Sequence, residues 1–337
     1  MNKFLLFVGI VFLTVGGAWF VRTASQNDAA EKFRTAFLVT PEKQRREVFE
    51  EYMGKLGTAR ILDVLEGQYP LCHSQAHDLG KVLFRETGDI NEAVAECRTR
   101  CTSGCFHGIL MEAFQGSGDH VMLADVKKKI ERICSDPEVT SIHREGNCSH
   151  GVGHALMYLA GYRIDEALSY CKLFPDRRLE YYCNGGAFME YDITNGKTDF
   201  DTKPRWYPCD TFTEFPAACY GYKVQRLMSK GASADELREK CMELEGYERL
   251  GCFHGLGVAH LVGASVFPQR LAEACQYGTL DDKKACIGAT VERLSSYDEE
   301  LARKICPFLE DGLKEFCEEA ASRKAYSLDK SFDLYFE

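Results

Sequence analysis

Apolar residues recur with the spacing of amphipathic helices along most of this chain. In the segment CSHGVGHALMYLA, Leu156, Leu159 and Ala160 fall on one helix face. Gly161 follows as a stop signal, and the next segment, residues 165–171, repeats the apolar spacing with acidic residues in its first turn. The pattern predicts pairs of short helices that bury their apolar faces only when neighbouring pairs stack.

A short phrase opened by cysteine returns about every 34 residues, which is the period of a helical repeat array. Phrases such as CFHGILME, CSHGVGHA and CFHGLGVA show the likeness. The phrase cysteines are Cys72, Cys105, Cys148, Cys183, Cys219, Cys252, Cys286 and Cys317. We therefore expect an all-α fold, an α-solenoid of about seven to eight two-helix repeats, with the first helix of each repeat starting at its phrase cysteine.

A second cysteine ends the second helix of most repeats, which gives two possible disulfide registers. These cysteines are Cys97, Cys134, Cys171, Cys209, Cys241, Cys275 and Cys306. Pairing within a hairpin gives Cys148–Cys171, and pairing across the following linker gives Cys171–Cys183. Parity favours the linker register, because it leaves only Cys72 and Cys101, which are close enough in sequence to pair. We expect oxidation to be essential for folding.

Composition and charge narrow the function classes. The chain has 337 residues, 16 cysteines and a formal net charge of −10. No Lys/Arg run offers the footprint that phosphate binding needs, so nucleic acid is excluded as the main partner. There is no CxxC motif, which disfavours zinc-thiolate and covalent haem sites, and the cysteine density favours an oxidising compartment.

The N-terminus carries an apolar stretch, Phe4 to Val21, between Lys3 and Arg22. Its length suits a membrane span, and its flanking charges favour a bulk chain outside the cytoplasm. We expect a signal anchor in residues 1–25, with a cleaved signal peptide and secretion as the alternative. Either interpretation places the remaining chain in the periplasm or outside the cell.

Four segments follow from these patterns. After residues 1–25, residues 26–71 are expected to form N-terminal capping helices, and residues 72–320 to form the disulfide-stapled array. Residues 193–208 interrupt the array with two prolines and no helical period, so we expect an irregular loop there. Residues 321–337 read as a loosely packed tail.

Seven of the nine histidines lie inside the repeated phrases. They are the candidate metal ligands: His150, His154, His107, His73, His77, His254 and His260. Two pairs are spaced by four residues, which puts both rings on one helix face, the geometry of two-histidine metal sites. His254 and His260 are six apart and should not converge. Asp78, Glu112 and Glu190 are the carboxylates that might complete a site.

Two interpretations of these histidines stay open. Neutral imidazoles suit a transition metal such as Zn, Cu or Fe. Alternatively, each histidine donates a hydrogen bond to a neighbouring repeat, and the glycines beside it permit close helix approach. Catalysis has little support, because there is no GxSxG motif and a Cys/His pair would need Cys101 or Cys72 to escape pairing.

The expected architecture resembles exported, disulfide-stapled Sel1-like repeat arrays over about residues 72–320, by its period and cysteine placement. The side-chain signatures of Sel1 and tetratricopeptide repeats are absent, so the resemblance implies architecture alone. The leading hypothesis is an exported, membrane-tethered scaffold that binds a protein or peptide partner. The alternative is a transition-metal-binding protein or metalloenzyme that uses the repeated histidines.

Overall fold

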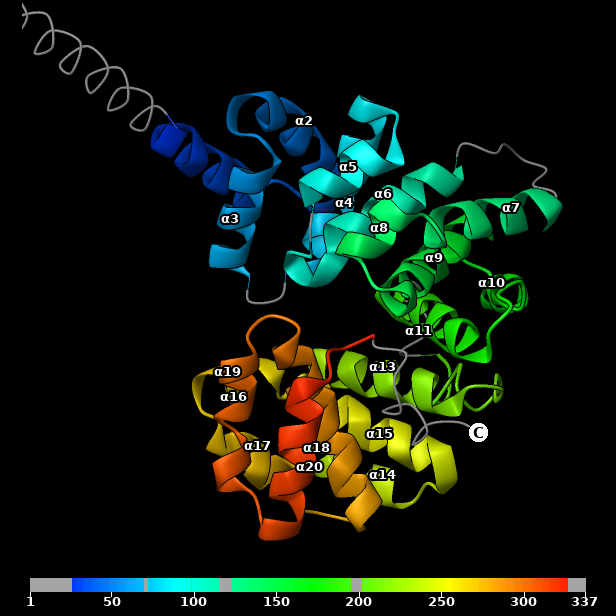
Figure 1. Ribbon diagram of the computed structural model, residues 1–337, viewed down its shortest axis with the longest axis vertical. Helices are drawn as coiled ribbons and strands as arrows, with labels where there is room; N and C mark the ends of the chain where they lie inside the picture. The colour runs from blue at the N-terminus through cyan, green and yellow to red at the C-terminus, as the bar shows by residue number, and fades with distance from the viewer. Residues whose placement is uncertain (1–25, 70–71, 98, 116–122, 195–201, 327–337) are drawn as a thin grey trace, which may run out of the picture. The chain divides into compact units, whose positions relative to one another are not determined.

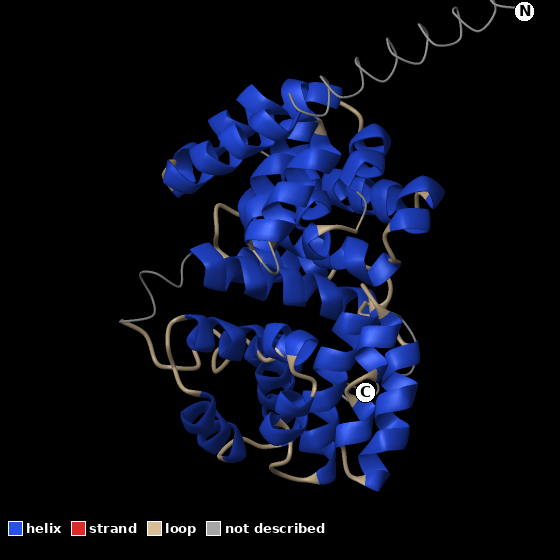
Figure 2. Ribbon diagram, turned by 90° about the vertical axis from the view of Figure 1, so that its left-hand side faces the viewer, coloured by secondary structure: helices blue, strands red, loops and turns tan. Residues whose placement is uncertain are grey.

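The structure is a computed structural model that describes residues 26–326 except 70–71, 98, 116–122 and 195–201. The described residues are helical and contain no strand, so the expected all-α class is confirmed (Figures 1 and 2). The chain divides into two units, Met1–Ile109 and Leu110–Glu337, here called the N-terminal and C-terminal units.

The N-terminal unit is a set of helices around an aromatic core. Residues 26–39 are helical, and Phe33, Phe37 and Phe49 are almost fully buried with ring centroids 5.2 to 5.9 Å apart. The elements that follow are η1 (Glu42–Gln44), α2 (Arg45–Leu56), α3 (Thr58–Gln68), α4 (His73–Thr87), α5 (Ile90–Cys97), η2 (Cys101–Ser103) and α6 (Gly104–Gln115), whose last residues belong to the C-terminal unit.

The C-terminal unit repeats a long helix followed by one or two short ones. Its elements are α7 (Leu123–Cys134), α8 (Pro137–Ile142), α9 (Glu145–Leu159), α10 (Ile164–Cys171), α11 (Arg177–Thr194), α13 (Pro216–Ser229), α14 (Ala234–Met242), α15 (Gly246–Ala259), α16 (Leu261–Val266), α17 (Gln269–Ala274), α18 (Leu280–Ser295), α19 (Glu299–Arg303), η3 (Cys306–Phe308) and α20 (Asp311–Ser322). The long helices pack in chain order, α9 on α11, then α13, α15, α18 and α20 (Figure 1). The architecture is therefore helical and repeat-like.

All 16 cysteines are paired, and the linker register is confirmed. Cys72–Cys101 forms as expected from parity. The other pairs are Cys97–Cys105, Cys134–Cys148, Cys171–Cys183, Cys209–Cys219, Cys241–Cys252, Cys275–Cys286 and Cys306–Cys317. A catalytic Cys/His pair that uses an unpaired thiol of Cys72 or Cys101 is therefore excluded.

Glycines set the distance between successive long helices. A Cβ on Gly153 of α9 would lie 2.0 Å from the Cys183 carbonyl oxygen of α11, and one on Gly257 of α15 would lie 2.0 Å from the Cys286 oxygen of α18. Such contacts exclude any side chain, so the backbones touch at these points. Both glycines stand five residues after their phrase cysteine, and the close approach expected for the phrase glycines is present.

Cys72 and Cys105 lie at the start of α4 and α6, as expected, but the later phrase cysteines do not begin their helices. α9 starts three residues before Cys148, and α15 starts six residues before Cys252. Each of these cysteines instead lies about one or two turns inside its helix, where it is bonded to a cysteine in the last turn of an earlier helix, Cys134 of α7 or Cys241 of α14.

Cys72 does not occupy the position of the other phrase cysteines. In α4, the glycine that meets the next helix is Gly80, whose Cβ would lie 1.9 Å from the Cys105 carbonyl oxygen. Cys148 and Cys252 stand five residues before their contact glycines, and the residue five positions before Gly80 is Gln75. Cys72 therefore lies about one helical turn before the equivalent position. It is the N-cap of α4 and staples a loop instead of a helix interior.

The structure describes parts of the predicted loop and tail, but not the predicted N-terminal segment. The signal anchor or signal peptide falls on residues 1–25, outside the described residues. None of the described helices combines the length and the apolar composition that a membrane span requires. Of the expected loop, residues 193–194 complete α11 and residues 202–208 form turns. The tail is packed as far as Tyr326, because the Ala325 amide donates to the Glu292 carbonyl of α18 at 3.1 Å.

Candidate functional site

Three of the candidate histidines meet in the N-terminal unit. His73 and His77 lie on consecutive turns of α4, and His107 faces them from α6. The ring centroids of His73 lie 4.8 Å from those of His77 and 5.0 Å from those of His107, and all three side chains are buried. We call these three residues the histidine cluster. Each can offer a ring nitrogen, and these nitrogens lie within 4.8 Å of one another.

The hydrogen bonds of His73 define its tautomer. The Thr102 hydroxyl donates to the Cys101 carbonyl at 2.7 Å, so its oxygen can only accept from His73 Nδ1, also at 2.7 Å. The Thr102 carbonyl accepts from the same nitrogen at 3.0 Å. Nδ1 therefore carries the hydrogen, and Nε2 presents its lone pair to His77. A histidine anchored through one nitrogen to a carbonyl is the usual arrangement of a metal ligand.

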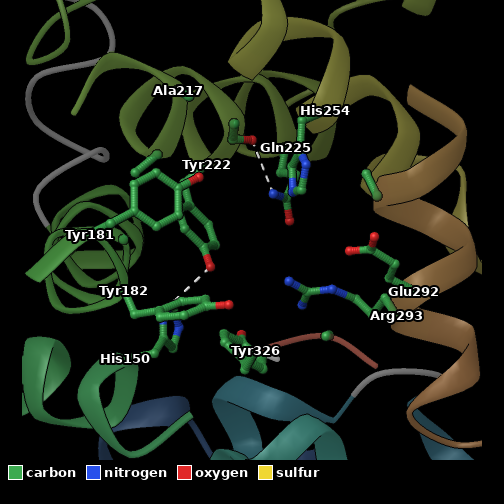
Figure 3. Close-up of a pocket in the computed structure, with 15 residues that line it drawn as sticks. His150, Tyr181, Tyr182, Ala217, Tyr222, Gln225, His254, Glu292, Arg293 and Tyr326 are labelled. Atoms are coloured by element: carbon green, nitrogen blue, oxygen red, sulfur yellow. Dashed lines mark hydrogen bonds between the residues drawn. The ribbon is translucent and has the colours of Figure 1, made fainter. Parts of the chain in front are cut away.

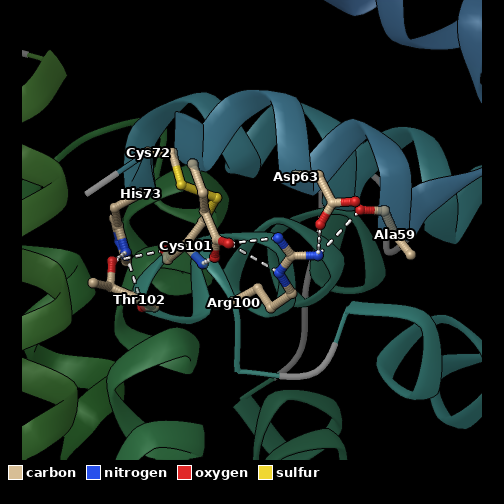
Figure 4. Close-up of a disulfide and its surroundings, with 8 residues drawn as sticks. Ala59, Asp63, Cys72, His73, Arg100, Cys101 and Thr102 are labelled. Carbon is tan, nitrogen blue, oxygen red and sulfur yellow. Dashed lines mark hydrogen bonds and ion pairs between the residues drawn. A yellow bond between two sulfur atoms is a disulfide. The ribbon is translucent and has the colours of Figure 1, made fainter. Parts of the chain in front are cut away.

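The loop that holds Thr102 is clamped from several sides (Figure 4). Cys101, Thr102 and Ser103 all have positive φ, a conformation that non-glycine residues avoid unless their surroundings enforce it. The Cys72–Cys101 disulfide ties this loop to the start of α4. Arg100 adds ion pairs to Asp63 and Glu66 and a 3.1 Å bond to the Ala59 carbonyl. These links fix the orientation of His73.

The spacing of the cluster matches a small metal ion. His73 Nε2 and His77 Nε2 are 3.1 Å apart. Two ligands of a tetrahedral ion with bonds of about 2.0–2.1 Å stand about 3.3 Å apart. With Nε2 of His73 as the acceptor, His77 donates this hydrogen bond, and a bound metal ion would replace that proton. Three imidazole nitrogens would leave a fourth position for another ligand.

The second pair with four-residue spacing lies in the C-terminal unit, on α9. His154 Nε2 is 3.3 Å from His150 Nε2, and its Nδ1 is 2.8 Å from Glu190 Oε2 of α11. All three side chains are almost fully buried. Glu190 thus orients His154 in the way that outer-shell carboxylates orient zinc ligands. His150 Nδ1 lies 3.4 Å from the Tyr222 hydroxyl of α13. Within this unit, therefore, two of the candidate imidazoles converge, those of His150 and His154.

His254 and His260 do not converge, as their spacing predicts. His254 lines one cavity, and His260 lines a separate cleft with Arg238 and Tyr277. Burial, aided by the charge of Arg293, lowers the pKa of His254 to about 3, so this imidazole is neutral. The pKa of His260 is also lowered by burial.

The three carboxylates that might complete a metal site have different surroundings. Glu190 contacts His154, as described above. Asp78 forms salt bridges with Lys81 at 3.5 Å and with Arg46 at 3.9 Å. Glu112 is partly buried on α6.

A tyrosine-lined cavity of about 60 Å³ lies in the C-terminal unit, bounded by α9, α11, α13, α15, α18 and the segment after α20 (Figure 3). That volume suits a few water molecules or a small ligand. Arg293 points into it from α18, and Gln225 from α13. Its aromatic wall consists of Tyr181, Tyr182, Tyr222 and Tyr326.

Sequence reasoning missed this cavity. Aromatic residues at helical spacing are more readily interpreted as core, and many of them are core here. A partial signal was the glycine that stands in place of histidine two residues after a phrase cysteine, at Gly185, Gly221 and Gly288. The first two of these glycines line the cavity. Comparison with known protein families, curated proteins and solved structures gives no match for this chain.

Proposed function

We propose that this protein binds a transition metal ion through His73, His77 and His107. The observation that carries the proposal is the convergence of three buried imidazoles, with the ring of His73 already anchored through Nδ1. An all-nitrogen site suits Zn(II) or Cu(II), and Fe(II) less well. Because His107 is fully buried, the ion would be held tightly and would stabilise the folded chain.

We further propose that the repeats form an α-solenoid that presents this site outside the cytoplasm. Support comes from the repeated glycine contacts between long helices and from the disulfides between successive helices. Disulfides on this scale belong to an oxidising compartment. The membrane tether and the protein or peptide partner expected from the sequence stay predictions.

Elemental analysis tests the metal proposal directly. The full chain, produced without a polyhistidine tag and folded oxidatively, is loaded separately with Zn²⁺, Cu²⁺ or Fe²⁺ and desalted in the presence of a weak chelator. We expect about one tightly held ion per chain, and loss of that ion in His73→Ala and His107→Gln. Cobalt substitution should give the intense visible absorption of a four-coordinate nitrogen site.

Two control variants distinguish ligation from packing. His260→Ala removes an imidazole that lines a separate cleft, and His143→Ala removes a fully buried one that bonds Asn147. Both should keep the metal. If wild-type protein with a full complement of disulfides holds no metal, or if His107→Gln holds as much as wild type, the proposal fails and the cluster is a packing device.

A further inference from the structure

We propose that the tyrosine-lined cavity binds a small carboxylate anion, with Arg293 as its anchor. The cavity is a second site, distinct from the histidine cluster, and it does not depend on metal binding. Concave sites with a few convergent polar groups on an aromatic wall are the usual form of small-molecule sites. Here the polar groups include one guanidinium, one amide and several phenols.

Arg293 supplies the charge. Among the described residues, its partners are the Tyr222 hydroxyl and the Tyr326 ring, whose centroid lies 5.8 Å from Cζ, and no carboxylate lies within ion-pair distance. Burial disfavours its charged form, but the phenols of Tyr326 and Tyr222 outweigh that cost and hold the pKa of the guanidinium above its ordinary value. A guanidinium has five N–H donors, so it keeps donors for a carboxylate in fork geometry.

The other polar groups of the cavity do not oppose an anion, and one of them can donate to it. Burial raises the pKa values of Tyr181, Tyr182 and Tyr222, so these phenols stay protonated and carry no negative charge that would repel the anion. The Gln225 amide nitrogen already donates to the Gly221 carbonyl at 3.0 Å, and its second hydrogen is available to a ligand. The neutral ring of His254 adds no charge that would compete with Arg293.

Glu292 is the one carboxylate among the residues that line the cavity. Burial raises its pKa to about 7; Arg323, 3.2 Å away, opposes this shift, and Glu319 adds to it. Below that pH the group is neutral and can donate a hydrogen bond to the anion. Above it the negative charge repels the anion, although Arg323 from beyond α20 and Arg293 beside it reduce the repulsion. Binding is therefore expected to be tightest at slightly acidic pH.

The small volume and the aromatic wall select among anions. A cavity of about 60 Å³ admits a carboxylate on a short apolar chain and excludes a nucleotide or a sugar phosphate. The ring faces would contact the apolar part of the ligand, whereas a phosphate would place oxygens against them. A cation would meet Arg293.

Isothermal titration calorimetry of the full chain at pH 6 tests the inference, with acetate and propionate as probes. Phosphate and tetramethylammonium serve as comparison ligands. We expect propionate to bind, and Arg293→Met to weaken its binding at least about 10-fold. The matched control is Arg238→Met, which removes an arginine that lines the other cleft and stacks on Tyr277. It should bind propionate as wild type does.

Two further variants keep the test informative if Arg293→Met fails to fold. Arg293→Lys keeps the charge but loses the fork geometry, so binding should weaken several-fold while circular dichroism stays native. Gln225→Leu removes the amide donor and should act in the same direction. The inference is overturned if no carboxylate binds to wild type, if phosphate binds more tightly than propionate, or if folded Arg293 variants bind as wild type does.

Discussion

The histidine cluster and the tyrosine-lined cavity are built on the same pair of positions in two helix pairs. A Cβ on Gly108 of α6 would lie 2.0 Å from the His77 carbonyl oxygen, and one on Gly186 of α11 would lie 1.9 Å from the His150 oxygen. This contact makes His77 the counterpart of His150. The Gly80 and Gly153 contacts described above give the same alignment independently.

The aligned positions then differ in two residues. The counterpart of His107 is Gly185, and the counterpart of His73 is Gly146. A Cβ on Gly185 would lie 3.2 Å from the Tyr222 ring, and one on Gly146 would lie 2.5 Å from the Tyr182 ring. Tyrosines from other helices therefore occupy the room that imidazoles occupy in the N-terminal unit.

The packing of the long helices is therefore separable from the chemistry of their inner positions. Glycine contacts between backbones are common to both pairs, and they hold the helices at one spacing. Two positions then decide between an imidazole cluster and an aromatic cavity. Function in such a scaffold is expected to vary through those positions without a change of fold.

The largest effect should come from breaking the shared backbone contact in either unit. Gly80→Ala and Gly153→Ala each place a Cβ about 2 Å from a backbone oxygen, so the helices must separate. We expect a loss of about 3 kcal/mol or more in the free energy of unfolding, or failure to fold. Urea denaturation measures it.

The controls for these two variants are Gly67→Ala in α3 and Gly312→Ala in α20, where a Cβ would meet nothing within 4 Å. Both lie in helices, so alanine should be neutral or slightly stabilising. Equal losses in all four variants would show that helix propensity, and not the backbone contact, explains the glycines.

The next largest effect should come from removing the Cys72–Cys101 disulfide, which supports the histidine cluster and has no counterpart at the cavity. Cys72→Ser with Cys101→Ser opens a loop of 29 residues and should cost about 3–4 kcal/mol of unfolding free energy. It should also release Thr102 from His73 and weaken metal binding about 10- to 100-fold. Chelator competition and urea denaturation give the two readouts.

Cys306→Ser with Cys317→Ser is the matched control, because neither cysteine belongs to the histidine cluster or lines the cavity. It should lower stability by a similar amount and leave metal affinity unchanged. A parallel loss of metal in both variants would mean that the staple acts through global stability alone.

A smaller effect should come from the carboxyl group that only the cavity contains. The folded pKa of Glu292 is about 7 against an ordinary 4.5, so the folded state holds more protons between these values. The contribution of Glu292 to the free energy of unfolding should therefore be fully present below about pH 4.5. It should decrease as pH rises to 7, by about 3 kcal/mol at most. Buried Asp192, with its pKa raised to about 6 by burial against the pull of Lys223, gives a slope of the same sign.

Glu292→Gln separates the two contributions. The free energy of unfolding of this variant, measured by urea denaturation from pH 4.5 to 7.5, should decrease less steeply than that of wild type. The decrease that remains would come from Asp192. Identical slopes would show that Glu292 ionises freely in the folded protein.

The repeat, the all-α class and the disulfide register were predictable because they depend on spacing and parity. The chemistry of the inner positions was not. The His73/His77 and His150/His154 pairs look equivalent in sequence, yet they differ by one helical turn, since His77 aligns with His150. The shift is revealed only by the glycine contacts between helices, those of Gly108 and Gly186 and those of Gly80 and Gly153. Likewise, Tyr326 reaches the cavity from beyond the array, which no local pattern indicates.

The smallest effect should come from converting one site toward the other. Gly185→His combined with Tyr222→Ala places an imidazole where its Cβ lies 3.6 Å from His150 Nδ1, and removes the ring that fills this room. His154 Nε2 already stands 3.3 Å from His150 Nε2. The C-terminal unit would then hold three imidazoles, so the chain should gain a second, weaker metal site. Elemental analysis should rise from about one ion per chain toward two in excess metal. In a His107→Gln background, the same pair of changes should leave only the new site.

The control is Tyr222→Ala alone. If the variant with both Gly185→His and Tyr222→Ala holds no more metal than this control, a third imidazole is insufficient. In that case the clamped loop around Thr102, which has no counterpart at Gly146, would be the feature that makes the N-terminal cluster a site.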